Sequence, residues 1–307
     1  MKKTLLVLSI SLLAASSQAQ QMTQFSQYLL NDYYINPAVA GTKDYSPLRL
    51  TYRAQWANFN GAPKTTGISF HSNYLDNMGI GGIIFNDKTG PLTQTGLEVT
   101  YAYHLEIEND IKVSLGLSAK ATQYALDESQ ITLEETGDFA FNGLTNKTLI
   151  PDAGFGAYLY SKEYFIGLSV PQLFQARIRY DTDDEKLNKE VRHYYLTGGY
   201  DFEINNDFSV QPSFLLKTVF TAPTTFDINV KATYQEMVSV GVSYRFKDAI
   251  VVIVGVEKEN FMLGYAYDVT TSMIRKYSAG SHEIVLGYNI PSRRKAMGKK
   301  RFSPRMG

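Results

Sequence analysis

Apolar and polar residues alternate strictly along many segments of this chain. Residues 48–56 place Leu, Leu, Tyr, Ala and Trp on one face and Arg, Thr, Arg and Gln on the other. A period of two residues indicates a β-strand with one apolar and one polar face. The same alternation is found at 65–74, 97–105, 111–120, 226–235, 238–246, 261–269 and 284–288, and more weakly at 78–86, 153–161, 164–171, 193–203 and 208–217. The pattern predicts about 14 strands.

The two faces of these strands indicate a membrane barrel. The apolar face is aliphatic in mid-strand and carries Tyr and Phe toward the strand ends, which suits lipid and its interfaces. The other face holds Ser, Thr, Asn, Gly and charged residues, whereas a soluble barrel fills its interior with apolar side chains. A span needs about 9–11 residues per strand and a closed sheet. We therefore predict an all-β, outer-membrane antiparallel β-barrel over residues 47–290; the alternative is a secreted soluble β-protein.

The lengths of the predicted connections predict the orientation of the barrel. Counted from the N-terminus, the even-numbered connections near 75–77, 106–110, 161–163, 203–207, 235–236 and 257–260 are all short and polar. The odd-numbered ones include the two longest, 125–152 and 172–192, and we expect only one tight odd turn, near Lys247 and Asp248. Outer-membrane barrels have short periplasmic turns and longer external loops. The pattern therefore predicts that both termini lie in the periplasm.

The first residues carry a targeting signal. Residues 1–3 are basic, residues 4–15 are almost entirely apolar, and Ser17-Gln18-Ala19 has the small-x-small form of a cleavage site. This organisation is typical of a secretory signal peptide over residues 1–19, because a membrane-spanning helix needs about 20 apolar residues. The mature chain is expected to begin at Gln20, with a lead-in over 20–46 before the barrel.

The net charge of zero hides a segregation of charges. The chain has 30 basic and 30 acidic residues, but the basic tail, residues 291–307, has no acid and seven basic residues: Arg293, Arg294, Lys295, Lys299, Lys300, Arg301 and Arg305. Residues 20–290 consequently have an acidic excess. A protein without a basic excess is a poor match for nucleic acid, so we expect no nucleic-acid partner.

Residues that could carry chemistry are few. The chain has no cysteine, and its four histidines are scattered without the spacing of a metal site. Ser69 and His71 share a polar face, which leaves a lipid hydrolase as a remote alternative. We expect no enzyme activity, no catalytic or metal site and no cofactor. The charged residues of the inward face have mixed signs, which favours bracing of the barrel over ion selectivity: Glu98, Asp227, Asp268, Glu283, Lys112, Lys120, Lys231, Arg49, Arg53 and Arg245.

The lead-in differs from the strands that follow it. It contains an Asn-Pro pair and a group of tyrosines, and it is expected either to pack in the barrel mouth or to act as a plug or docking element. The basic tail is expected to be a solvated extension, or to contact an acidic periplasmic partner or anionic headgroups. The candidate partner-binding residues are Asn31, Asn36, Pro37, Ala38 and Gly41 in the lead-in and Arg293, Arg294, Lys299 and Arg301 in the tail.

The sequence QYLLNDYYINPAVAGT at residues 27–42 resembles the opening of the PorP/SprF family of type IX secretion outer-membrane proteins. Further blocks resembling this family follow in order: PDAGFG (151–156), YFIGLSVP (164–171), RHYYLTGGY (192–200), QPSFLLK (211–217), FDIN (226–229), GVSYRF (241–246), GYAYD (264–268) and GSHEIVLG (280–287). The chain departs from the family pattern at its end, which is Met306-Gly307 rather than an aromatic residue.

The resemblance implies a non-enzymatic barrel of the Bacteroidota that serves type IX secretion. SprF-like members support the export and surface attachment of a gliding adhesin, and PorP-like members associate with periplasmic components of the system. The partners it implies are therefore the C-terminal domain of a secreted protein, periplasmic secretion components and outer-membrane lipid. The alternative function is a channel for a hydrophobic or small solute.

Overall fold

The structure is a computed structural model that describes residues 25–108, 110–130, 145–176, 178, 190–220 and 222–291. The predicted signal peptide (1–19) and the four candidate residues of the tail, Arg293, Arg294, Lys299 and Arg301, lie outside the described residues.

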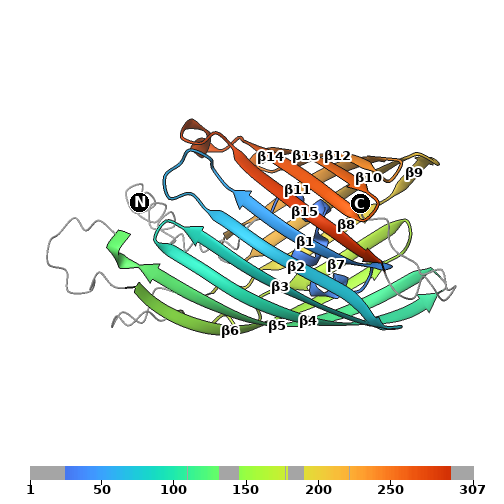
Figure 1. The fold of residues 1–307 in the computed structure, drawn as a ribbon, viewed down its shortest axis with the longest axis horizontal. Helices are drawn as coiled ribbons and strands as arrows, with labels where there is room; N and C mark the ends of the chain where they lie inside the picture. The colour runs from blue at the N-terminus through green and yellow to red at the C-terminus, as the bar shows by residue number, and fades with distance from the viewer. Residues whose placement is uncertain are drawn as a thin grey trace, which may run out of the picture.

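The chain forms one closed antiparallel β-barrel (Figure 1). Its strands are β1 (Tyr45–Ala54), β2 (Lys64–Leu75), β3 (Met78–Thr89), β4 (Leu92–Glu108), β5 (Ile111–Asp127), β6 (Thr145–Tyr160), β7 (Tyr164–Val170), β8 (Tyr194–Tyr200), β9 (Phe202–Asn205), β10 (Phe208–Val219), β11 (Ala222–Tyr234), β12 (Val238–Arg245), β13 (Ala249–Lys258), β14 (Phe261–Thr270) and β15 (Ser281–Pro291). Because β8 and β9 both pair with β10 and are separated only by Asp201, they act as one interrupted strand.

Pairing of β1 with β15 and of β10 with β11 completes the circle of strands. The prediction of a 14-stranded antiparallel barrel is therefore confirmed. Among the described residues, no helix is long and apolar enough to cross a membrane.

The predicted alternation places apolar residues outside and polar residues inside. Leu50 and its neighbour Ile68 on β2 are 40% and 46% exposed on the outer face. The neighbouring pair in the same register, Arg49 of β1 and Ser69 of β2, is buried in the lumen. Each strand thus satisfies its backbone groups within the sheet while presenting an apolar surface outward.

The connections differ strongly between the two ends of the barrel. One end carries only short turns, such as Asp76-Asn77, and we call it the short-turn end. The other end, on the left of Figure 1, carries the long connections between β1 and β2, β5 and β6, β7 and β8, and β14 and β15, and we call it the long-connection end.

The prediction of a single tight turn at the long-connection end was wrong. Two further tight turns lie there, between β3 and β4 and between β10 and β11, in addition to the one between β12 and β13. At the first of them, Gly90 has a φ of 55°, a left-handed conformation that glycine adopts without steric cost. Thr89 and Leu92 can therefore pair directly across two residues.

Three short 3₁₀-helices precede the first strand and lie inside the barrel: η1 (Gln27–Leu29), η2 (Asp32–Tyr34) and η3 (Pro37–Val39). They form the blue segment within the ring of strands in Figure 1. We call residues 25–44 the luminal segment. Two more 3₁₀-helices, η4 (Glu128–Gln130) and η5 (Met273–Lys276), lie in long connections.

Candidate functional site

The luminal segment supplies half of the buried residues in one apolar cluster inside the barrel. Tyr33, Ala38, Val39 and Ala40 are at most 1% exposed and pack against inward residues of the wall. Local sequence explains the last helix, because the Asn36 side chain accepts a hydrogen bond from the Ala38 N–H at 2.9 Å and Pro37 occupies the first helical position. The interior of this barrel is therefore filled by a segment of the chain itself.

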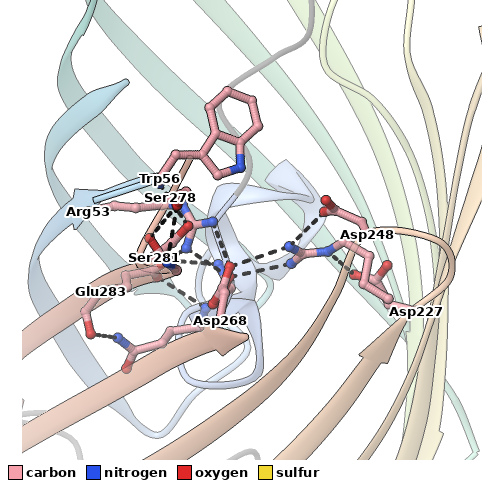
Figure 2. Close-up of polar contacts among 12 residues, drawn as sticks. Arg53, Trp56, Asp227, Asp248, Asp268, Ser278, Ser281 and Glu283 are labelled. Carbon is pink, nitrogen blue, oxygen red and sulfur yellow. Dashed lines mark hydrogen bonds and ion pairs between the residues drawn. The ribbon is translucent and has the colours of Figure 1, made fainter. Parts of the chain in front are cut away.

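Five buried ionic side chains of the wall meet near the long-connection end. Figure 2 shows four of them with labels: Arg53, Asp227, Asp268 and Glu283. We call Arg53, Asp227, Arg245, Asp268 and Glu283 the charge cluster. Arg53 contacts Asp268 at 2.7 Å and Glu283 at 3.0 Å. Arg245 contacts Asp227 at 3.4 Å and Asp268 at 3.5 Å. Because a buried charge is costly unless it is paired, this mutual pairing is what permits the cluster inside the barrel.

The charge cluster also holds the first residues of the luminal segment. The Ser26 and Gln27 N–H groups donate to the two carboxylate oxygens of Glu283, at 2.7 and 3.0 Å. The Ser26 hydroxyl donates to Asp268 at 2.7 Å and accepts from Arg53 at 2.8 Å. Hydrogen bonds to ionised groups are about twice as strong as neutral ones, so this end of the segment is firmly held.

Other inward charges predicted with these residues lie elsewhere. Glu98 of β4 is paired in register with Lys120 of β5, and the Lys120 ammonium lies 5.5 Å from the centre of the Phe85 ring. Arg49 donates to Asn289 at 2.6 Å. Within the described residues, the predicted set thus divides into one ionic cluster and several local contacts.

Two histidines hold the opposite end of the luminal segment. The Gly41 N–H donates to His71 Nδ1 at 3.1 Å, and His104 Nε2 lies 3.0 Å from the Ala40 carbonyl oxygen. Tyr160 contacts the other nitrogen of His104 at 3.2 Å. Both imidazoles are therefore engaged in fixing the backbone of residues 40–41.

The serine of the remote hydrolase alternative has a similar structural contact. Ser69 accepts a hydrogen bond from the Asn31 side chain at 2.9 Å. Among the described residues, no group of three or more His, Asp or Glu side chains could hold a metal ion. The arrangement favours a structural role for Ser69 and His71.

Inward glycines make room for the luminal segment. A Cβ built on Gly79 would lie 2.0 Å from the Ala40 carbonyl oxygen, and one on Gly116 would lie 2.4 Å from the Ala38 nitrogen. On Gly156 it would lie 2.0 Å from the Asn36 side-chain oxygen. Sequence reasoning treated these glycines only as members of the polar face. Glycine at inward positions of β3, β5 and β6 was the available signal that a backbone passes closely.

The candidate residues of the lead-in are all buried. Asn36 donates to the Ala157 carbonyl at 3.2 Å, Asn31 contacts Ser69, and Gly41 contacts His71. Pro37 and Ala38 lie in η3 against the wall. Each of the five thus has contacts within the barrel, and a role toward a partner stays a prediction.

Two spaces border the luminal segment. One is lined mainly by apolar side chains, among them Leu29, Ile35, Val39 and Phe165. The other is polar and lies at the short-turn end, beside Lys43. Lys43 itself lies outside the strands, and burial lowers the pKa of its ammonium while the nearby Asp32 carboxylate acts in the opposite direction. The apolar space is the feature that suits a hydrophobic solute.

A protein-family model described as "Type IX secretion system membrane protein PorP/SprF" matches residues 17–288. Comparison with curated protein sequences gives no match.

Solved structures show the same fold at low sequence identity. The CymD monoaromatic hydrocarbon channel has 12% identity and a TM-score of 0.53, and the match covers 88% of this chain and 94% of that one. A Pseudomonas aeruginosa FadL homologue has 9% identity and a TM-score of 0.50, with 85% and 94% covered. These likenesses support an outer-membrane barrel.

Proposed function

Because this chain belongs to the PorP/SprF family of type IX secretion system membrane proteins, we propose that it supports the secretion of a partner protein and holds that partner at the cell surface. The partner contact would be made through the C-terminal domain of the secreted protein, and a gliding adhesin is the cargo that the family resemblance suggests. Periplasmic components of the secretion system would contact the short-turn end.

The observation that carries this proposal is the occupied lumen. The luminal segment is bonded to the wall on several sides, through Tyr28 to Asn229 of β11 at 2.9 Å and through Tyr33 to Thr100 of β4 at 2.8 Å. A solute moving along the barrel axis would have to break these contacts and those of the charge cluster. A barrel filled in this way is better suited to anchoring than to conduction.

The long-connection end offers a surface for such a partner. Large apolar side chains are exposed there on several different connections: Phe59, Phe174, Phe220, Met273 and Tyr277. Exposed apolar residues gathered at one end of a protein are typical of interaction sites. We place this end on the cell exterior because outer-membrane barrels carry their longer connections on that side.

Deletion of the gene tests the proposal. We expect a large secreted protein to disappear from the cell surface and to appear in the medium or the periplasm, and the wild-type gene to restore it. Surface proteolysis and cell fractionation measure the distribution. A deletion strain in which every secreted protein still reaches and stays on the surface would refute the proposal.

A channel for a hydrophobic solute is the second candidate, and the apolar space beside Leu29, Ile35 and Phe165 favours it. The same deletion strain separates the two functions. Loss of a channel would reduce uptake of an apolar solute while the surface proteins remain in place, whereas loss of an anchor would have the reverse effect.

A further inference from the structure

The luminal segment runs through the barrel in a defined direction. Its first residues, Ser26 and Gln27, contact Arg53, Asp268 and Glu283. Each of these three residues is among the three that lie nearest the long-connection end in its strand. The segment therefore begins at the long-connection mouth.

The end of the segment lies at the opposite mouth. Gly41 contacts His71, and its carbonyl accepts from Asn73 at 3.3 Å, close to the Asp76-Asn77 turn. Residue 45 then enters β1 at the short-turn end, beside Pro291, the last residue of β15. The chain thus crosses the lumen once before it enters the wall (Figure 1).

The length of the residues before this segment decides on which side the mature N-terminus can lie. Cleavage after Ala19 leaves residues 20–24, and five extended residues reach at most ~17 Å. The hydrocarbon core of a bilayer is ~30 Å thick. From the position of Phe25, whose ring packs against Tyr34 at 4.5 Å between centroids, such a short leader cannot return to the short-turn side.

We propose that the mature N-terminus is displayed on the outer face of the membrane, at the long-connection mouth, while the chain leaves β15 on the periplasmic side. This proposal departs from the prediction, made from the connection lengths, that both termini lie in the periplasm. The luminal segment is then a strap through the barrel, and its outer end is bonded to Glu283 through the buried residues Ser26 and Gln27. This inference rests on the predicted cleavage site and the orientation of the barrel, and it does not depend on the secretion role.

Single cysteines test the proposal cleanly because the natural chain contains none. Gln21→Cys marks the leader, Met273→Cys marks an exposed residue of a long connection, and Asn77→Cys marks a short turn. Each variant is treated with a membrane-impermeant maleimide, in intact cells and after permeabilisation of the outer membrane. N-terminal sequencing of the purified protein verifies the cleavage site.

We expect Gln21→Cys to react in intact cells to an extent comparable with Met273→Cys, and Asn77→Cys to react only after permeabilisation. If Gln21→Cys reacted only after permeabilisation, as Asn77→Cys should, the proposal would be overturned. Failure of Gln21→Cys to react both in intact and in permeabilised cells would also overturn it. If Asn77→Cys reacted in intact cells and Met273→Cys only after permeabilisation, the orientation of the barrel would be the opposite of the one assumed. That result would also overturn the display of the N-terminus on the outer face.

Discussion

Glu283 joins the luminal segment to the wall through two backbone hydrogen bonds and one ion pair with Arg53. Its carboxylate is fully buried. A neutral amide at this position can accept fewer of these bonds and leaves Arg53 with one carboxylate partner, Asp268, instead of two. The position therefore couples the charge cluster to the fold of the segment.

We expect Glu283→Gln to destabilise the barrel by about 3 kcal/mol, since the buried Arg53 loses one of its two carboxylate partners and the Ser26 and Gln27 N–H groups lose an ionised acceptor. Thermal unfolding in detergent, followed by circular dichroism, measures the change. Glu108→Gln is the matched control, because Glu108 is exposed on β4. Equal stability of the two variants would contradict the role given to Glu283.

Gly116 and Gly241 provide a second matched pair at the residue scale. Both lie at buried inward positions of strands, but a Cβ at Gly116 would meet the Ala38 nitrogen at 2.4 Å, whereas the nearest atom at Gly241 is 3.5 Å away. We expect Gly116→Ala to cost about 1–3 kcal/mol, as overpacking does, and Gly241→Ala to have little effect. The same thermal measurement applies, and similar losses in both variants would show that the luminal segment does not press on Gly116.

At the scale of elements, the strands could be predicted from alternation alone, but their irregularities could not. The break between β8 and β9 at Asp201 interrupts a segment whose pattern predicts one continuous strand. The tight turn at Gly90 depends on a left-handed backbone conformation, which the alternation of apolar and polar residues cannot predict. Both features depend on backbone geometry rather than on which residues are apolar.

The luminal segment was the least predictable element. Its Asn-Pro pair and tyrosines led us to expect packing in the barrel mouth or a role as a plug or docking element, but not the helix cap that the structure has at Asn36. Its path through the lumen is determined by contacts with residues far away in the sequence, such as Ser26 with Glu283 and Tyr28 with Asn229. Such contacts exist only after the barrel has closed, so a pattern read along the chain cannot show them.

At the scale of the whole molecule, the parity of each strand correctly assigned Arg53, Asp227, Arg245, Asp268 and Glu283 to the lumen. That these five meet follows from the order of strands β11 to β15 and β1, which brings residues more than 200 positions apart into contact. The sequence therefore predicted which residues face inward, while closure of the sheet decided which of them became partners.

Part of the acidic excess of residues 20–290 lies at the short-turn end of the barrel. At least one exposed carboxylate accompanies each of the short turns, for example Asp76, Glu163 and Glu236. The long-connection end instead exposes apolar side chains such as Met273 and Tyr277. The two mouths of the barrel thus present different chemistry to the two sides of the membrane.

The luminal segment fills the lumen, and we expect it to close the barrel to ions. Single-channel recording of the purified full-length protein in a planar bilayer tests it most directly, with a variant lacking residues 25–40 as the comparison. We expect the wild-type barrel to show no steady conductance and the shortened barrel to conduct, because the polar wall would then be lined by water. A steady conductance through the wild-type protein would contradict the claim.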